Sequence, residues 1–164
     1  MDSLMKYINR IHRCAGQYRS VRLPKNELRP HQHIYIFHVC RNPGISQEQL
    51  SKLICVNKSS VTRQLSMLEK HGYITRETDK DDRRMMRVYP TLEAEELYPK
   101  VVCIMKEWNE LLLDELSFAE KEQFIKILER LTNRAIQAVE GDNGEIPDFE
   151  EYQIQCQSNK GVRK

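Results

Sequence analysis

The chain has 164 residues, 30% of them charged and 40% hydrophobic, with a formal net charge of +2, which suits one domain with a core of its own. No apolar run approaches the roughly 20 residues that a membrane span needs, and the N-terminus lacks the apolar core of a signal peptide, so we expect a cytoplasmic protein without a membrane partner. The five cysteines are scattered and lack CxxC spacing, which argues against a disulfide framework, a zinc site or another cofactor.

Residues 2–20 have the apolar period of a helix. One apolar stripe consists of Leu4, Ile8, Ile11, Ala15 and Tyr18, and a second of Tyr7, Cys14 and Val21. A helix that is apolar on two sides needs two partners, which fits a subunit interface. A single wide stripe that faces the core is the alternative.

Residues 30–40 follow a loop at residues 23–26 and contain the almost continuously apolar run HIYIFHVC. By periodicity alone this run fits a buried strand or a buried helix. We expect a helix from its context, with Pro30 in the first turn. Asn42, Pro43 and Gly44 then predict a turn.

A helix-turn-helix comes next. Ser46 and Gln49 have the spacing of a capping box, which opens a short helix to about Ile54. Asn57 is a good N-cap for the following helix, and Gly72 is a natural residue to end it. The predicted buried stripe of this second helix is Val61, Leu65 and Leu68, and the first helix is expected to bury Leu50, Leu53 and Ile54. Two helices joined by such a short turn form a helix-turn-helix.

Two strand-like runs, Tyr73–Thr78 and Met85–Tyr89, flank the charged segment Asp79–Arg84. A helix-turn-helix followed by strand, charged hairpin tip and strand predicts a winged helix. Pro90 should stop the second strand, and Thr91 can cap a new helix.

The C-terminal half is predicted to be helical. Residues 92–116 form a long helix that Pro99 bends slightly. Ser117 and Glu120 make a second capping box, which opens a helix to about Val139. Residues 141–164 are rich in Gly, Asp and Glu without a sustained period, so we expect a flexible tail.

The charge is unevenly distributed along the chain. Residues 1–30 carry seven Lys and Arg against two Asp and Glu, and residues 57–87 carry eight against five. Residues 88–164 carry nine against sixteen. A basic first half with an acidic second half is typical of a nucleic-acid-binding face backed by a solvated scaffold.

Three segments carry a family resemblance: Leu28–Gln32, Val61–Arg76, and Asp82–Arg84 with Val88 and Thr91. They resemble the opening of the second helix, the recognition helix with its run into the wing, and the wing tip with its second strand in the MarR family of bacterial winged-helix transcription regulators. The similarity runs from about Leu28 to Val101. Pro90 departs from the family's usual Leu, and Asp81 from the Arg of many members, so both Arg83 and Arg84 stay candidates for the minor groove.

The resemblance implies a mainly α fold with a small β-hairpin wing. Residues 28–91 would form the winged helix-turn-helix DNA-binding domain, and residues 1–27 and 92–140 would supply dimerisation helices from both termini. The implied function is a sequence-specific regulator, expected to be a repressor, that binds a palindromic operator in double-stranded DNA as a homodimer. A small-molecule ligand is expected to relieve the repression.

The start of the predicted recognition helix is polar, which lets its backbone approach base edges. The candidate DNA-binding residues there are Lys58, Ser59, Ser60, Thr62, Arg63 and Gln64, with Ser46 at the start of the preceding helix. Thr62 can offer a methyl group to thymine, Arg63 can bind guanine through two hydrogen bonds, and Gln64 can do the same with adenine. The alternative is that half or more of these residues contact only phosphate.

The wing has a different role. Arg83 at the hairpin tip can enter a narrow minor groove, and Asp82 could orient it through a charge-assisted hydrogen bond. Arg84 and Arg76 complete the predicted DNA-binding set. The alternative for the segment Asp79–Arg84 is a solvated turn whose charges neutralise one another.

Cys14 raises the alternative of a redox-sensing regulator. It lies one helical turn from Tyr18, in a basic setting, and peroxide-sensing members of the resembling family carry a reactive cysteine on that helix. The sequence around Cys14 lacks the apolar flank of those sensors, so the favoured interpretation is a buried structural cysteine.

Other residues admit two interpretations. A metal site built from His31, His33 and His38 is disfavoured by their helical spacing, and we expect ordinary polar or capping histidines. Tyr35, Phe37 and Trp108 fit the core, or alternatively the lining of a ligand cavity. No phosphate loop, nucleotide turn or acyl-transfer triad is present in the sequence, so we do not expect an enzyme. A winged helix that binds protein is a third possibility, but it would not need Arg63, Arg83 and Arg84 together.

Overall fold

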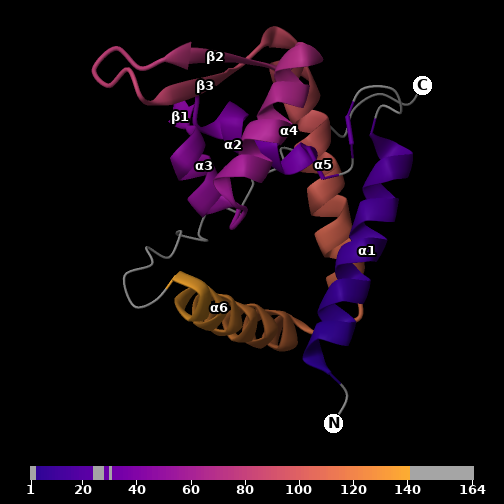
Figure 1. The fold of residues 1–164 in the computed structure, drawn as a ribbon. Helices are drawn as coiled ribbons and strands as arrows, with labels where there is room; N and C mark the ends of the chain where they lie inside the picture. The colour runs from indigo at the N-terminus through magenta and orange to yellow at the C-terminus, as the bar shows by residue number, and fades with distance from the viewer. Residues whose placement is uncertain (1–2, 24–27, 30, 141–164) are drawn as a thin grey trace, which may run out of the picture. The chain divides into compact units, whose positions relative to one another are not determined.

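The computed structural model describes residues 3–23, 28–29 and 31–140. Its chain forms two compact units, Met1–Asp114 and Glu115–Lys164. The elements α1 to α5 and the sheet belong to the first unit, and the helix α6 belongs to the second (Figure 1). The flexible tail expected over residues 141–164 lies outside the described residues.

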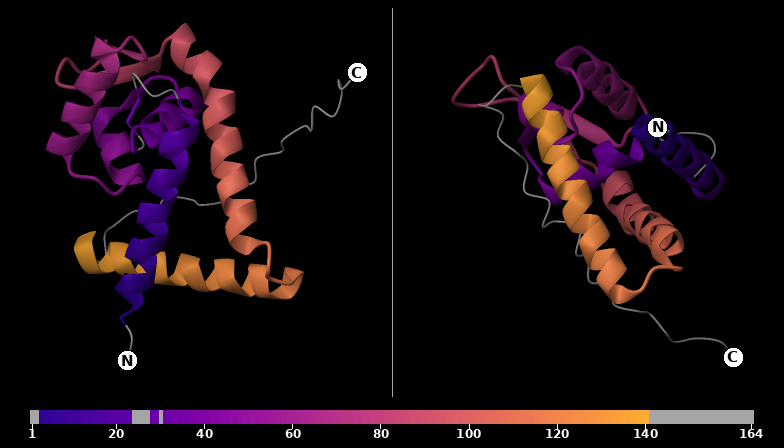
Figure 2. Two further views of the ribbon diagram at one scale, coloured as in Figure 1. Left: turned by 90° about the vertical axis from the view of Figure 1, so that its right-hand side faces the viewer. Right: turned by 90° about the horizontal axis from the view of Figure 1, so that it is seen from below.

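The first unit contains the winged helix-turn-helix that the sequence predicts. Its elements are α2 (His33–Arg41), β1 (Ile45–Ser46), α3 (Gln47–Leu53), α4 (Lys58–Lys70), β2 (Ile74–Thr78) and β3 (Met86–Pro90). The fold is mainly α with a small antiparallel sheet, as expected. The β2–β3 hairpin is the wing, and its loop extends beyond the helices of the unit (Figures 1 and 2).

The apolar run HIYIFHVC forms the helix α2, which confirms the expectation of a helix. Ile36, Phe37 and Val39 have no exposed surface, and Tyr35 is buried too. The helix packs against α5 and β3. Because neighbours cover it on several sides, nearly every position is apolar and the helical period is masked.

Local capping signals fix the helix boundaries. The Gln49 amide donates to the Ser46 hydroxyl at 3.1 Å, and the Ser46 amide donates to the Gln49 side chain at 3.0 Å, which completes the predicted capping box. Asn57 accepts from the Ser60 amide at 2.8 Å, so it caps α4 as predicted. Gly72 follows α4 with φ +78°, the left-handed conformation that favours glycine.

The sheet has the strand order β1-β3-β2. The sequence did not predict β1, because two residues are too few to show an alternating pattern. Ile45 pairs with Val88 across the sheet, and Ile74 pairs with Pro90. Pro90 is therefore the last residue of β3 rather than a block beyond it, and its missing N–H is tolerated at a strand end.

The core of the first unit lies where α2, α3, α4 and the sheet meet. Its largest fully buried side chains include Phe37, Leu50, Leu65, Leu68, Ile74 and Val88. Val61, Leu65 and Leu68 face this core, which confirms the predicted stripe of α4. Leu50 is buried as expected, whereas Leu53 and Ile54 stay partly exposed near the end of the short helix α3.

The helix α1 (Leu4–Arg22) packs beside α5 (Leu92–Leu113) within the first unit. The Tyr18 ring lies 5.1 Å from the Trp108 ring, and the Arg22 guanidinium lies 3.6 Å above Tyr18. Most of the other apolar residues of α1 are exposed: Leu4, Met5, Tyr7, Ile8, Ile11 and Val21. Of the two predicted apolar stripes, only Ala15 and Tyr18 are thus packed in the single chain, and the other members of both stripes are exposed.

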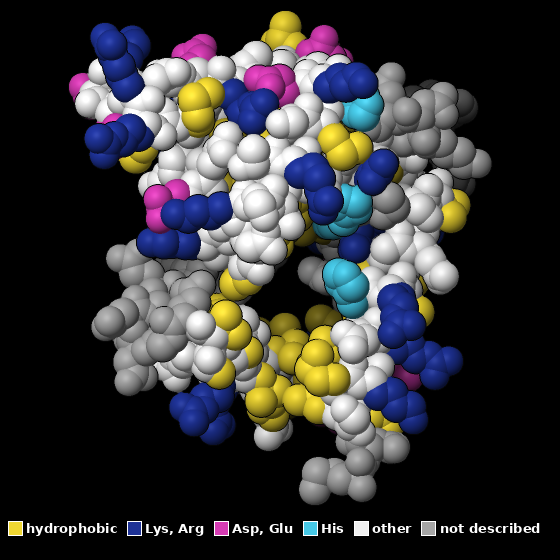
Figure 3. All heavy atoms as spheres, viewed as in Figure 1, with side chains coloured by type: hydrophobic (Ala, Val, Ile, Leu, Met, Phe, Trp, Pro, Cys, Tyr) yellow, Lys and Arg dark blue, Asp and Glu magenta, His cyan; other side chains and the backbone are white. Residues whose placement is uncertain are grey.

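The helix α6 (Phe118–Glu140) begins at the predicted capping box. The Ser117 amide donates to the Glu120 carboxylate at 2.8 Å, and the Glu120 amide donates to the Ser117 hydroxyl at 3.4 Å. Exposed large apolar side chains on this helix are Phe118, Phe124, Ile125, Ile127, Leu131 and Val139 (Figure 3). Among the described residues, no helix is both long and apolar enough to cross a membrane.

Candidate nucleic-acid interface

A short turn joins α3 and α4. The Ser51 hydroxyl donates to the Val56 carbonyl at 2.6 Å, and the Val56 amide donates back to the Ser51 carbonyl at 3.1 Å. Between them, Cys55 has φ +51°, a left-handed conformation that is costly for a residue with a side chain. The turn therefore holds α4 at a fixed angle to α3.

The outer face of α4 carries the predicted guanine-binding residue. Val61, Leu65 and Leu68 bury one side of the helix, and Arg63 lies on the exposed side. Within the part of the chain that the structure describes, the Arg63 guanidinium has no hydrogen bond or ion pair. Its five N–H donors are available to a ligand with acceptors in one plane.

Several other candidates on α4 already have partners inside the protein. The Ser59 hydroxyl donates to the Asn57 side chain at 2.8 Å, and the Thr62 hydroxyl lies 2.9 Å from the Lys58 carbonyl and 3.2 Å from the Gln47 side chain. In this conformation Ser59 can only accept a further hydrogen bond. The orientations of these polar groups are set by the protein.

Lys58 and Ser46 lie at the junction of the two helices. The Lys58 ammonium donates to Glu48 at 3.0 Å, which lowers the pKa of the Glu48 carboxyl. Ser46 is only 4% exposed, and its hydroxyl is the cap of α3. Of these two, the Lys58 side chain is the one at the surface.

Gln64 differs from the neighbouring candidates because it is joined to α2. Its side-chain oxygen lies 3.1 Å from the Gln32 side-chain nitrogen and 3.1 Å from the His31 Nε2. No local signal in the sequence predicts these contacts, since the partners lie 32 and 33 positions away. The predicted contact of Gln64 with adenine would need this oxygen as well as the nitrogen, and the oxygen lies against Gln32 and His31.

One carboxylate, Asp79, organises the wing. The amides of Asp81 and Asp82 donate to its Oδ1 at 2.8 and 2.9 Å, and the Arg87 guanidinium binds its Oδ2. The Asp82 amide, Arg87 and the Asp81 amide together lower the pKa of the Asp79 carboxyl to about 2. Arg87 also donates to the Gly44 carbonyl at 3.2 Å, which fastens the wing to the turn before β1.

The wing tip presents cations to solvent (Figure 3). Asp82 was expected to orient Arg83, but its carboxylate accepts from the Arg84 backbone amide at 2.9 Å. Lys80, Arg83 and Arg84 are exposed, and none has an ion pair with another residue of the described ranges. The acids of the tip thus shape the backbone and leave the arginine side chains available.

Arg76 is held inside the unit. Its guanidinium donates twice to the Glu69 carboxylate, and the Arg76 side chain is 18% exposed. This pair joins α4 to β2 and lowers the pKa of the Glu69 carboxyl. The charge of Arg76 is already balanced by a carboxylate, and its predicted contact with DNA stays a prediction.

The other residues singled out in the sequence lie away from this surface. Cys14 is exposed in the single chain, so the favoured interpretation of a buried structural cysteine is wrong. Tyr35 and Phe37 belong to the core, as expected. His38 is buried, which lowers its pKa to about 4. In the described ranges no three metal-binding side chains come together.

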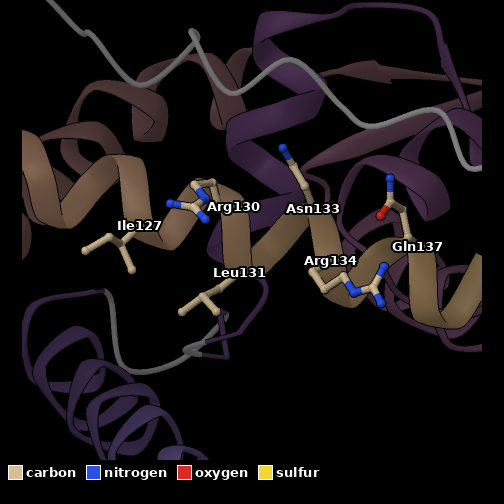
Figure 4. A pocket seen from close by; sticks show the side chains of 6 residues that line it. All are labelled: Ile127, Arg130, Leu131, Asn133, Arg134 and Gln137. Atoms are coloured by element: carbon tan, nitrogen blue, oxygen red, sulfur yellow. The ribbon is translucent and has the colours of Figure 1, made fainter.

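The structure also has a hollow of about 540 Å³ beside α6 (Figure 4). Its lining residues are Ile127, Arg130, Leu131, Asn133, Arg134 and Gln137. All six lie on one helix, so the described residues supply one wall of the hollow. This differs from the expected cavity lined by Tyr35, Phe37 and Trp108.

Residues 29–86, which include α2, the helix-turn-helix and most of the wing, match the model of the MarR family. The chain is also 25% identical over 131 residues to the HTH-type transcriptional regulator YybA of Bacillus subtilis, covering 80% of this chain and 87% of YybA. Residues 29–86 are thus a MarR-family domain. This MarR-family protein is therefore a DNA-binding transcriptional regulator and not an enzyme.

Solved structures extend the similarity beyond the matched residues. A MarR protein from Peptoclostridium difficile is 25% identical to this MarR-family regulator, with a TM-score of 0.79 over 82% of this chain and 89% of the other. A putative MarR-family regulator from Listeria monocytogenes, complexed with a 26mer DNA, is 22% identical, with a TM-score of 0.78 over 89% of this chain and all of the other. The second similarity concerns the fold alone.

Proposed function

We propose that this regulator is a repressor that binds a palindromic operator as a homodimer and is released by a small-molecule ligand. The observation that carries the proposal is a set of exposed arginines that have no partner among the described residues: Arg63 on α4, and Arg83 and Arg84 on the wing. A helix-turn-helix and a hairpin supply two rigid supports for these charges.

The helix α4 would lie in the major groove. Its exposed face is polar where it begins, so its backbone can come close to the base edges, and Arg63 can donate two hydrogen bonds to guanine. Lys58 and the first amides of α4 would bind phosphates and fix the register of the helix on the duplex. Arg63 is the residue to which we assign base recognition.

The wing would lie over the minor groove, where the electrostatic potential is most negative at narrow sites. Asp79 fixes the loop through two backbone amides, so the tip does not have to become ordered on binding. Arg83 and Arg84 are adjacent and both exposed, and either can enter the groove. Exchanging each for alanine separately would identify which one does.

A homodimer would be formed by α1, α5 and α6. Exposed apolar side chains cluster on α1, and Leu111 and Leu112 are exposed at the end of α5. The stripe on α6 adds a third apolar face. Exposed apolar residues on each of these helices are typical of an interface, and two half-sites of a palindrome would lie about 34–36 Å apart.

The proposal is tested with duplex DNA from the region upstream of the regulator's own gene. We expect binding whose logarithmic affinity falls by roughly 0.9 per phosphate contact with each tenfold rise in salt. Exchanging Arg63, Arg83 and Arg84 together for alanine should abolish binding in fluorescence anisotropy and leave the dimer intact in analytical ultracentrifugation. Binding that survives the triple exchange would contradict the proposal and favour a protein-binding role.

Relief by a ligand is the least constrained part of the proposal. We expect a small molecule that raises the melting temperature of the protein and releases the operator in the same concentration range. The Arg130 and Arg134 side chains in the hollow along α6 make organic anions the first compounds to test. Ligands that stabilise the protein without releasing the operator would argue against relief.

Redox control through Cys14 is a second candidate. The exposure of the Cys14 thiol favours it, since a reactive cysteine must be accessible. Mass spectrometry after peroxide treatment should then find a sulfenate or disulfide at Cys14 together with loss of operator binding. Operator binding unchanged by peroxide would exclude this candidate.

A further inference from the structure

The amide of Gln64 has one defined orientation, and the reason begins at the Arg29 backbone. A glutamine amide has an oxygen that only accepts and a nitrogen that only donates, and the surrounding hydrogen bonds decide which way it points. The Arg29 N–H can only donate, and it lies 2.8 Å from one end of the Gln32 amide. That end must therefore be the Gln32 oxygen, and the other end is the nitrogen.

The orientation of the Gln32 amide in turn fixes that of the Gln64 amide. The Gln32 nitrogen donates across 3.1 Å to the Gln64 side chain, so the Gln64 atom that faces it must be the oxygen. His31 Nε2 lies 3.1 Å from the same oxygen and must carry a hydrogen to bond it. Gln32 has no exposed surface, so turning its amide around would leave a buried N–H facing another N–H.

With His31 in the tautomer that carries a hydrogen on Nε2, both lone pairs of the Gln64 oxygen are occupied inside the protein. The Gln64 nitrogen has no partner in the residues that the structure describes, and it is not among the buried unpaired atoms, so it keeps some exposed surface. Gln64 lies in the second turn of the recognition helix α4 (Lys58–Lys70), beside the buried Val61 and Leu65.

We propose that Gln32 and His31 fix Gln64 as a residue that can only donate hydrogen bonds to DNA. Recognition of adenine by glutamine needs both the oxygen and the nitrogen of the amide, and here the oxygen is not available. The partner is therefore an acceptor: N7 of either purine, O6 of guanine, O4 of thymine, or a phosphate oxygen, and guanine offers two such acceptors where adenine offers one. The inference rests on the DNA-binding function and makes Gln32 a positioning residue for Gln64.

Exchanging Gln64 for glutamate tests the proposal. A glutamate would still accept from Gln32 and His31, but its outer oxygen would accept instead of donate. The full-length protein and its variants would be offered duplexes with a randomised half-site, and bound sequences would be counted after selection. Gln17→Glu on the exposed surface of α1 is the control for the added negative charge, and because α1 belongs to the proposed dimer, its dimerisation is verified by analytical ultracentrifugation.

Two results support the proposal and separate its two sources of acceptor. If Gln64 contacts a base, one position should prefer guanine or thymine, lose that preference in Gln64→Ala and shift about tenfold toward cytosine or adenine in Gln64→Glu. If it contacts phosphate, Gln64→Glu should weaken all sequences by about tenfold and leave every preference unchanged, with Gln17→Glu weakening them less than twofold.

The positioning role of Gln32 has its own readout. Gln32→Met keeps the length of the side chain and removes the amide, so Gln64 would be free to turn. If Gln64 contacts a base, the relative affinity for adenine at that one position should then rise at least threefold. A merely structural loss would weaken the binding of all sequences equally. If Gln32→Met does not fold, the two Gln64 variants still decide the orientation.

Two results would overturn the proposal. One is a wild-type preference for adenine that Gln64→Ala abolishes, and the other is unchanged affinity and preference in both Gln64 variants. A wild-type protein that selects no sequence and binds no duplex would overturn the DNA-binding function as well, so the two failures are distinguishable.

Discussion

The recognition helix and the wing prepare their charged and polar groups in opposite ways. On α4, Ser59, Thr62 and Gln64 are already hydrogen-bonded to other protein groups, which fixes the direction of each remaining donor or acceptor. On the wing, Asp79 and Asp82 bind backbone amides, and the side chains of Arg83 and Arg84 have no bond to the residues that the structure describes. The difference indicates that α4 supplies selectivity through fixed orientation, while the wing supplies affinity through charge.

The largest effect should come from removing the wing charges. Exchanging Arg83 and Arg84 together for alanine should lower the affinity for duplex DNA about a hundredfold at low salt, with nearly the same factor for every sequence. The slope of log affinity against log salt should become shallower by roughly 1 to 2 per subunit. Anisotropy titrations at several salt concentrations measure both. A loss of affinity for only one sequence would mean that the wing recognises bases, which would contradict the assignment of selectivity to α4.

Acid should act on the helical core and on the wing at different pH. Burial lowers the pKa of His38 in α2 to about 4 from 6.5, so the unfolded chain binds a proton that the folded one refuses. The free energy of unfolding should therefore fall as pH drops from 6.5 toward 4, by about 3 kcal/mol. Asp79, with its pKa near 2, keeps its bonds throughout this range.

Urea unfolding at pH 7, 5.5 and 4 measures this dependence, and His38→Leu is the control because it removes the titrating group. The difference between the wild type and His38→Leu should shrink or reverse in favour of the variant as the pH falls. A difference that does not change with pH would show that the pKa of His38 is the same in the folded and the unfolded chain.

Arg63 is the sharpest test of the recognition helix. Arg63→Ala should reduce the affinity for the preferred operator about tenfold and relax the preference at one position of each half-site. Non-specific duplex should be affected by less than about threefold. Arg63→Lys should restore part of the affinity but little of the preference, since lysine lacks the two-pronged geometry. A uniform loss over all sequences would place Arg63 on phosphate.

The Asp79 carboxylate should strengthen DNA binding, although its charge is negative, because it organises the wing loop. Asp79→Ala makes the protein more positive, so charge alone would strengthen DNA binding. We expect instead a weakening of about fivefold, because the loop loses its amide contacts and its bond to Arg87 and must become ordered on binding. Asp81→Ala removes the same charge without these bonds and should bind equally well or more tightly. Equal behaviour of the two variants would refute the role of Asp79.

The smallest effect is expected in the turn before α4. Cys55 has a left-handed backbone, and glycine adopts that conformation without strain. Cys55→Gly should raise the free energy of unfolding by about 0.5 to 1 kcal/mol, measured in urea, with unchanged operator preference. Cys55→Ala keeps the strain and should give no gain.

Features that depend on neighbours in the sequence could be predicted, and features that depend on distant partners could not. Ser46, Asn57 and Gly72 act within one turn of helix, so their spacing alone indicated the boundaries. The exposed Arg63 and Arg83 followed from helical period and hairpin position. Those predictions concern where a side chain lies, and the structure agrees with them.

The hydrogen-bond and ion-pair partners of the polar side chains could not be predicted from the sequence. The charges of the segment Asp79–Arg84 allowed a turn that neutralises itself, but the Asp79 carboxylate binds backbone amides and Arg87, which lies eight positions away. Arg76 was a candidate for DNA until the structure placed Glu69 against it. Several acids compete for each arginine, and only the fold decides which pair forms.

Ser46 belongs to two elements at once. It is the last residue of β1, paired with Arg87 of β3, and it is also the N-cap of α3. A movement of the wing strands must therefore displace the start of α3. The hairpin and the helix-turn-helix should move together as one rigid body. A signal that changes the fit to DNA would then act through the long helices. It would change the distance between the winged helix-turn-helix units of the two subunits and would not bend the wing.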